Sequence, residues 1–335
     1  MSDIFSKYKA SYADGFYDLF LGTAFTSGSY YSLWYFKDSY LSIITVVLCA
    51  LMNLKMFIIF HDCSHDSYTP SPRLNLIIRT LMAPFFYFTE SWRYTHNTHH
   101  IANGRKGNTY DFAHNELIFY TLEQYKEMSP AFRALVKTVL HPISLFTILT
   151  YTKFILLHRF YALHFLVDTY VGSPQLIHIF AEQIFNNATI VAIIYFQYQY
   201  SILYHCLASV CVSSTLGALF FFNQHTYNPP YIVNNEEWTL KDSGLRGSSF
   251  IQIPWFLKYF TGGIEYHHIH HYNSKIPNYN LRALHDEVVS ETNMFDDIIE
   301  LSLADCSKNI WLSLYDEESG KYISFQEADE RSKNI

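Results

Sequence analysis

The sequence predicts an all-α, polytopic membrane protein with about four transmembrane helices and a histidine-rich cap on the cytosolic side. The chain of 335 residues is 50% hydrophobic and 18% aromatic, and its apolar residues gather in long stretches. No Asp, Glu, Lys or Arg occurs between positions 183 and 235. Nine histidines lie in three short clusters, at 61–65, 96–100 and 267–271.

The clearest expected span covers residues 41–60. Its sequence, LSIITVVLCALMNLKMFIIF, holds twenty positions with one charge, about the length that crosses a ~30 Å hydrocarbon core as a helix. Lys55 lies near one end of this stretch and could snorkel to the interface. The charge-free stretch 188–222 is long enough for two spans with a tight turn, expected at about 186–204 and 205–222.

Two further apolar segments are less regular. Residues 17–37 make a plausible first span, although two glycines and Asp18 interrupt them, and a buried or interfacial helix is the alternative. Residues 143–166 contain Lys153, Arg159 and two histidines, so an interfacial helix fits them better than a span. We therefore expect a single membrane domain over residues 1–325, followed by a flexible charged tail at 326–335.

Bulk charge and cysteine content exclude other classes. A net charge of −7 gives no basic patch for nucleic acid. The five cysteines show neither paired nor metal-type spacing, which favours a reduced, intracellular-facing protein. The first twenty residues carry charges among their apolar positions, so insertion is expected to depend on the internal spans.

Histidine spacing is the most specific signal. On a helix, positions i, i+3 and i+4 share one face, so the clusters HDCSH, HNTHH and HHIHH each align their histidines. A lone histidine near a membrane is usually only an interfacial polar residue, but three such clusters in one chain favour metal binding. The aligned imidazoles are those of His61, His65, His96, His99, His100, His267, His270 and His271.

The third cluster allows two choices. His267 with His270 and His271 repeats the i, i+3, i+4 face of the second cluster, whereas His268 would point away from it on a helix of about 3.6 residues per turn. Helical geometry therefore favours His267 as the ligand and leaves His268 beside the ligands or at the surface.

Ligand type narrows the choice of metal. Imidazole suits zinc, copper, iron and nickel, whereas a structural zinc site takes four ligands and usually includes cysteine. Eight imidazoles exceed what one ion can coordinate, which predicts two ions. Two irons beside a bilayer would point to oxygen activation on an apolar substrate.

The clusters and their flanks resemble the three histidine boxes of membrane fatty acid desaturases, especially the omega-6 acyl-lipid branch. The similar stretches are HDCSH, WRYTHNTHH at 92–100 and EYHHIHHYNSKIPNYNL at 265–281. Between and after the boxes, GNTYD at 107–111, FFNQHTY at 221–227 and WLSLYDEESGKYISF at 311–325 are also similar. The resemblance covers most of residues 40–325.

The resemblance implies a di-iron enzyme. Such a protein holds two iron ions in a cytosolic cap, reduces O2 and removes two hydrogens from an acyl chain carried as an acyl-lipid or acyl thioester. No haem-binding HPGG motif occurs, so electrons are expected from a separate protein of ferredoxin or cytochrome b5 type.

The resemblance also points to residues outside the aligned histidines. It suggests His225 as a ninth ligand, with a capping or interfacial histidine as the alternative. Asp62 and Glu265 sit beside ligands and could orient imidazole N–H groups, although solvated loop carboxylates are equally consistent. The remaining histidines lack partners at ligand spacing and are read as structural or interfacial: His114, His141, His158, His164, His178, His205 and His285.

Topology follows from parity. Boxes two and three reach the same side only if an even number of spans separates them, and the two spans between 186 and 222 satisfy this. Basic residues gather in the loop that bears the first two boxes, which the positive-inside tendency places on the cytosolic face. They are Arg73, Arg79, Arg93, Arg105, Lys106, Lys126, Arg133 and Lys137.

Two alternatives stay open. A lipid or carotenoid hydroxylase or ketolase would use the same boxes, because hydroxylation and desaturation diverge after the first hydrogen abstraction. A metal-binding or transport membrane protein without catalysis is the alternative from a different class. A transporter should place ionisable groups within its spans, whereas these clusters lie outside them.

Overall fold

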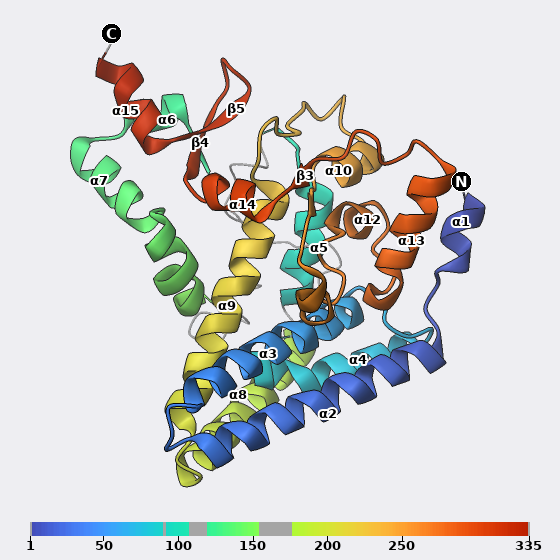
Figure 1. Ribbon diagram of the computed structural model, residues 1–335. Coiled ribbons are helices and arrows are strands. Elements are labelled where there is room, and N and C mark those ends of the chain that lie inside the picture. Colours follow the sequence, from blue (N-terminus) through green and yellow to red (C-terminus); the bar gives the residue numbers. More distant parts are fainter. Residues whose placement is uncertain (1, 90–91, 107–118, 154–175, 334–335) are drawn as a thin grey trace.

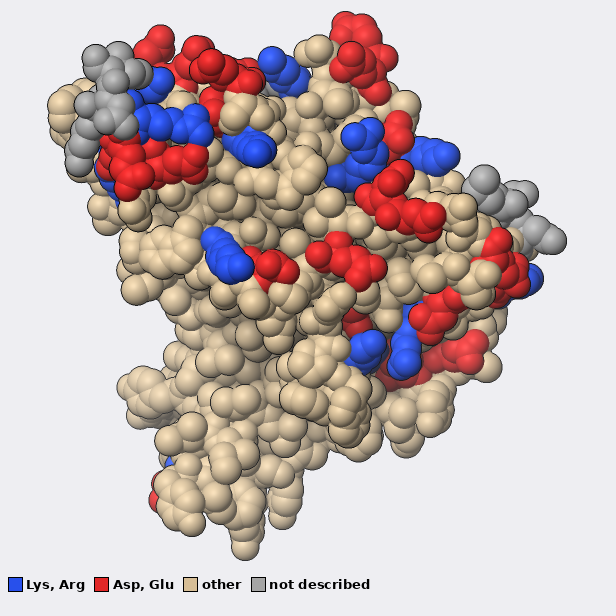
Figure 2. Space-filling view, turned by 45° about the horizontal axis from the view of Figure 1, so that its top comes forward, with Lys and Arg blue, Asp and Glu red and all other residues tan. Residues whose placement is uncertain are grey.

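The structure is a computed structural model that describes residues 2–89, 92–106, 119–153 and 176–333. Long helices form its lower part, and shorter helices, small sheets and loops form a wider cap above them (Figure 1). Figure 2 shows Lys, Arg, Asp and Glu side chains over the wide part, while the narrow lower part is almost free of them on that face. The expected division into apolar helices and a polar cap is therefore present.

Three helices in the described residues are long and apolar enough to cross a membrane, namely Ser42–Ser64, Ile177–Gln199 and Leu203–His225. The first is α3, and its position matches the span expected at 41–60. The other two lie in α8 (Leu176–Gln199) and α9 (Leu203–His225). These three apolar helices associate the protein with a membrane.

The bounds of α8 and α9 differ from those expected. Helix α8 begins ten residues before position 186, because a helix does not stop where its first polar side chains appear. The turn lies at 200–202, where Ser201 has a φ of 58°, rather than after residue 204. Helix α9 continues to His225 and so carries this histidine on its last turn into the cap.

Helix α2 (Tyr12–Phe36) covers the expected segment 17–37 and packs along α3. Gly22 allows the close approach, since a Cβ there would lie 2.8 Å from Sδ of Met56. The prediction that Lys55 snorkels is wrong. Its Nζ lies 2.7 Å from Oδ1 of Asp18, and the lysine side chain is 4% exposed. Asp18, which interrupts the apolar segment 17–37, thus pairs with Lys55, the one charge in the segment 41–60.

The cap is built from short helices around the upper ends of α3 and α9 (Figure 1). Helices α4 (Pro72–Met82) and α5 (Trp92–Ala102) follow α3, with the 3-10 turn η1 (Ala83–Phe86) after α4. On the other side lie α10 (Leu240–Arg246), the 3-10 turn η5 (Trp255–Leu257), α11 (Lys258–Thr261), α12 (His267–Tyr272) and α13 (Asn278–Glu291). Gly244 is needed where α10 meets α12, because a Cβ there would lie 2.6 Å from the backbone of Tyr272.

The all-α expectation needs a correction, because two small sheets are present. Strands β1 (Tyr120–Thr121), β4 (Leu312–Asp316) and β5 (Lys321–Ser324) form one sheet, and β2 (Phe250–Ile251) pairs with β3 (Glu300–Leu301). The hairpin β4–β5 turns at Gly320, whose φ of 64° favours glycine. These strands are too short to give a clear alternation in the sequence.

The C-terminal tail and the segment after α7 complete the chain. Helix α15 (Phe325–Lys333) occupies most of the tail that was expected to be flexible, and Arg331 pairs there with Asp316. The described residues also include the helices α6 (Leu122–Glu127), α7 (Pro130–Val139) and α14 (Leu303–Asn309). Of the expected interfacial segment, 144–149 form a π-helix, and 154–166 lie outside the described residues, as does the 107–111 motif.

The Lys55–Asp18 pair gives a stability prediction. Lys55→Met leaves the Asp18 carboxylate without its cation, which should lower the free energy of unfolding by about 3 kcal/mol. Lys55→Met combined with Asp18→Leu should recover most of that loss, because neither charge remains. Thermal unfolding in detergent micelles measures both. Lys37→Met, which breaks an exposed pair with Asp38, is the control, and a double variant as unstable as the single would contradict the prediction.

Candidate metal centre

Four helices bring the histidine clusters together at the lower edge of the cap. His61 lies in the last turn of α3, and His65 directly follows this helix. His225 ends α9. Helices α5 and α12 carry three and four histidines, respectively, of which all but one point into a common site. The histidines of the site are buried, at most 9% exposed.

The first histidine group contains His61, His65, His96, His100 and His270, whose candidate ligand nitrogens all lie within 4.8 Å of one another. Nε2 of His96 is 3.0 Å from Nε2 of His61 and 3.2 Å from Nε2 of His100. Nε2 of His270 is 3.1 Å from Nε2 of His100. Nitrogens from α3, α5 and α12 thus converge on one point.

The second histidine group contains His99, His225 and His271, and His267 lies against it. Nε2 of His225 is 3.1 Å from Nε2 of His99 and 3.0 Å from Nε2 of His267. The ring centroids of His267 and His271 are 4.6 Å apart. The two groups therefore contain seven of the eight aligned histidines and His225, and the eighth, His267, contacts the second group.

His268 points out of the site. Its Nε2 lies 3.3 Å from Nδ1 of His285, and its ring packs edge-on against Phe295 with centroids 4.7 Å apart. This is the orientation expected from the helical phase of α12. His285, read from the sequence as a structural residue, is the partner of His268.

The chemistry of the two groups fits a metal ion. In the described residues, both groups consist of imidazoles alone, and the carboxylate of Asp62 lies at the outer nitrogen of His61, not among the converging nitrogens. Nε2 of His65 and of His271 are buried and have no hydrogen-bond partner. Facing lone pairs of neutral imidazoles repel one another, and a cation between them is the partner that satisfies all of them at once. Each group could hold one ion.

Burial sets the protonation state of these rings. Desolvation, strengthened by the neighbouring imidazoles, holds the pKa of each well below the usual value of a histidine. The neutral ring is the form that binds metal. The rings concerned are those of His65, His96, His100, His267, His270 and His271.

Contacts on the outer ring nitrogens fix two of the histidines. His225 donates its Nδ1–H to the carbonyl of Gly247 over 3.0 Å, which turns Nε2 towards the second group. Asp62 lies 3.3 Å from Nδ1 of His61, and its other oxygen accepts a 2.6 Å hydrogen bond from the Asn278 backbone N–H, which starts α13. The role expected for Asp62 thus fits its position.

Glu265 does not contact a ligand in this way. Its carboxylate accepts a 2.7 Å hydrogen bond from the hydroxyl of Thr261, and burial raises its pKa. Adjacency in sequence to the third box thus does not turn this carboxylate towards a ring. The expectation that Glu265 orients an imidazole is therefore not met in the structure.

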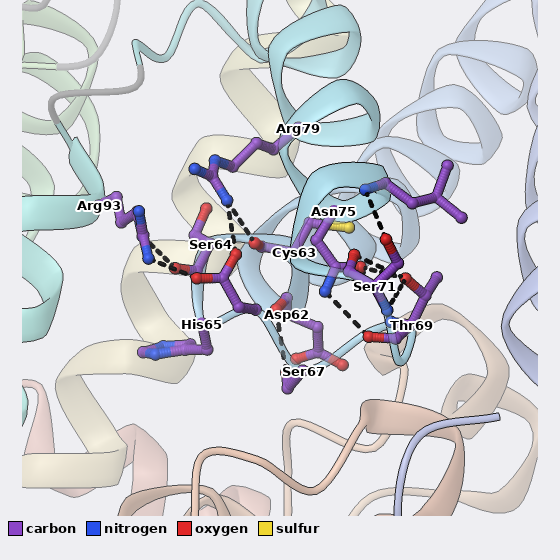
Figure 3. Close-up of polar contacts among 12 residues, drawn as sticks. Asp62, Cys63, Ser64, His65, Ser67, Thr69, Ser71, Asn75, Arg79 and Arg93 are labelled. Atoms are coloured by element: carbon purple, nitrogen blue, oxygen red, sulfur yellow. Dashed lines mark hydrogen bonds and ion pairs between the residues drawn. The ribbon is translucent and has the colours of Figure 1, made fainter. Parts of the chain in front are cut away.

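A set of contacts beside His65 is not predictable from the sequence. Figure 3 shows Arg79 and Arg93 pointing at the end of α3, on the side away from the ring of His65. The basic residues of this loop were read only as a topology signal, yet Arg79 is 4% exposed. A buried arginine cannot be recognised from its position in a basic loop.

Aromatic side chains close the apolar side of the first histidine group. Trp92 stacks on His96 with centroids 4.5 Å apart and an angle of 17°. Phe57, Phe60 and Phe88 surround Trp92 within ring-contact distance. The rings that meet the metal-binding nitrogens from below are thus apolar and continuous with the membrane-type helices.

Membrane-type helices beneath two buried histidine groups define a membrane protein with a metal-binding site. The chain matches the family model described as fatty acid desaturase over residues 38–295. It therefore belongs to the fatty acid desaturase family, whose members are oxidoreductases. This agrees with the resemblance carried by the histidine boxes.

Relatives in that family come from bacteria and plants. A fatty acid desaturase of Bacillus subtilis is 26% identical over 291 residues, which cover 85% of this chain and 78% of that protein. An sn-1 oleoyl-lipid 12-desaturase of Picosynechococcus is 26% identical, over 82% of this chain and 77% of that protein. A chloroplastic omega-6 fatty acid desaturase of Spinacia oleracea is 22% identical, over 81% and 59%.

The two adjacent histidines of α12 give a matched test of the site. His267→Ala removes an imidazole that faces His225, so we expect the bound metal to fall by about one ion per chain. His268→Ala removes a ring of the same size that faces His285, so the metal content should stay at the wild-type level. Elemental analysis of the purified variants measures this. The opposite order would mean that His268, not His267, is a ligand.

Proposed function

We propose that the protein is a membrane di-iron desaturase that introduces a double bond into the acyl chain of a lipid with O2 as oxidant. The observation that carries the proposal is the convergence of nine buried imidazoles, eight in two adjacent groups and His267 beside the second, where the apolar helices α3 and α9 end. Family membership supports the reaction class, and the relative named as an oleoyl-lipid desaturase supports an acyl-lipid substrate.

The proposed ligands divide five to four. One iron would be held by the first histidine group, and the other by the second histidine group together with His267. When bound, a pair of irons supplies the activation of O2 that removes two hydrogens from an unactivated chain. The set of neutral nitrogen donors suits iron but does not exclude other imidazole-binding metals, so iron is part of the proposal.

The protein's own residues hold and shield that site. Asp62 and the Gly247 carbonyl orient the rings of His61 and His225 through their outer nitrogens. Trp92 and the phenylalanines around it exclude water from the membrane side of the first histidine group. An acyl chain approaching from the bilayer would meet this apolar wall. Electrons would come from a separate donor protein of ferredoxin or cytochrome b5 type.

We propose four spans, with α2 as the first. Contacts between the segment before α2 and helix α13 support α2 as a span. Lys7 and Tyr8, just before α2, bind Glu287 of α13 in the cap, so α2 starts beside the cap and α3 returns to it. With α8 and α9 as a second hairpin, all three boxes face one side, which the basic loop favours as the cytosolic side.

The competing functions are less well supported. A hydroxylase or ketolase would share the histidine groups, but the relatives reported above carry desaturase names. A metal-binding or transport protein without catalysis does not fit membership in a family of enzymes. The reaction product separates desaturase from hydroxylase.

The reaction is tested by expression in a bacterial host of defined lipid composition. We expect new fatty acids that contain two hydrogens fewer than their precursors, with the double bond located by mass spectrometry. His65→Ala, which removes a ligand of the first histidine group, should abolish them while the protein still inserts. A chain that gains oxygen without a new double bond would replace the desaturase proposal by a hydroxylase.

The topology is tested by cysteine labelling in a background that lacks the five native cysteines. Single cysteines at the exposed positions Arg73 and Ser290 should react with an impermeant maleimide from the same side. A cysteine at Gln199, at the far end of α8, should react from the other side. Labelling of Arg73 and Ser290 from opposite sides would contradict an even number of spans between the boxes.

A further inference from the structure

Backbone and side chains together close the end of helix α3. The backbone N–H groups of Asp66 and Ser67 donate to the carbonyls of Cys63 and Asp62, and two arginines bind carbonyls there as well. Asp66 follows the C-cap residue His65 and has a φ of 52°, so the chain turns sharply there. The carbonyl of Cys63 accepts a 3.1 Å hydrogen bond from Arg79, and that of Ser64 accepts a 2.7 Å one from Arg93. Two cations thus occupy the negative end of the helix, where the dipole favours them.

Asp66 joins these two cations. Its Oδ1 accepts a 2.9 Å hydrogen bond from Nη1 of Arg79, and its Oδ2 a 2.6 Å one from Nη2 of Arg93 (Figure 3). Arg79 lies in α4, and Arg93 lies in α5. We name the three side chains of Asp66, Arg79 and Arg93 the carboxylate clamp. Charge-assisted contacts of this kind are short and directional, so the clamp fixes the end of α3 against α5.

The position of Arg93 links the clamp to the second box. Arg93 precedes His96 by three residues and His100 by seven, so the three side chains share one face of α5. His61 and His65 lie on the last turn of α3, whose carbonyls the clamp holds. The two helices that the clamp joins supply four of the five imidazoles of the first histidine group.

The second histidine group contains no imidazole from α3. Its imidazoles come from α5, α9 and α12, and none comes from the helix end that the clamp closes. A shift of α3 relative to α5 would therefore separate His61 and His65 from their partners and leave the second histidine group in place.

We infer that Asp66 is a positioning residue that assembles the metal site of the first histidine group by holding the end of α3 to α5 through Arg93 and to α4 through Arg79. This inference rests on the proposed function only because it assumes that each histidine group binds an ion. Asp66 neither faces the ions nor belongs to either group of converging nitrogens.

The test is anaerobic titration of metal-free protein in detergent with Fe2+, against a competing chelator. Asp66→Asn keeps the side-chain shape and tolerates the positive φ, but it removes the charge that binds both arginines. We expect one ion to bind with wild-type affinity and the other at least about tenfold more weakly. Adding His65→Ala to Asp66→Asn should change little further, whereas adding His225→Ala should remove the remaining tight ion.

Two variants keep the result interpretable. Asp316→Asn breaks an aspartate–arginine pair between β4 and α15 and should leave both affinities unchanged. Arg93→Lys keeps the positive charge but cannot bind Ser64 and Asp66 together, so it should weaken the same single ion even if Asp66→Asn does not fold.

Equal weakening of both ions in folded Asp66→Asn or Arg93→Lys, or no weakening in either, would overturn the inference. These outcomes differ from a failure of the proposed function. If the wild-type protein does not bind two Fe2+ ions, the di-iron proposal fails before any variant is compared.

Discussion

The convergence of nine imidazoles in a buried site is the constraint on which the rest of the structure depends. Each ring has lost its water, and burial keeps the pKa of the rings in the cap low, so their lone pairs face one another without compensating protons. Such an arrangement is stable only if a cation occupies the centre and the surrounding chain holds every ring in place. The helix ends around the site hold the rings in place.

Carboxylates lie next to the site but outside both histidine groups. Asp62 uses its charge on the ring of His61 and the first backbone N–H of α13, and Asp66 uses its charge on two arginines. The ligands themselves therefore carry no negative charge in the described residues. Asp62 and Asp66 would balance the charge of a bound ion only from outside the ligand set. The positions of these two side chains would therefore affect how tightly the ion binds.

Helical phase explains why the sequence predicted the aligned histidines so well. Spacings of three and four residues fix a common face before any tertiary contact is known, and this phase also separated His267 from His268.

The remaining features depend on contacts between distant segments. Asp18 and Lys55 looked like separate flaws in two spans, and only the packing of α2 on α3 pairs them. His225 has no partner at helical spacing, so only the family resemblance pointed to it. Glu265 was expected beside a ring on adjacency alone, which does not fix direction.

The two HxxHH clusters meet in a reciprocal arrangement. In α5, His96 and His100 face the first histidine group, while His99 faces the second. In α12 the order is reversed, since His270 faces the first and His271, together with His267, faces the second. Each helix therefore gives a pair to one site and a single ring to the other, which keeps the two sites adjacent. The remaining ligands complete them unequally, because α3 ends in a pair of histidines and α9 in one. The spacing HxxxH in the first box places both rings in one histidine group, whereas HxxHH is the spacing that lets one helix contribute to both groups.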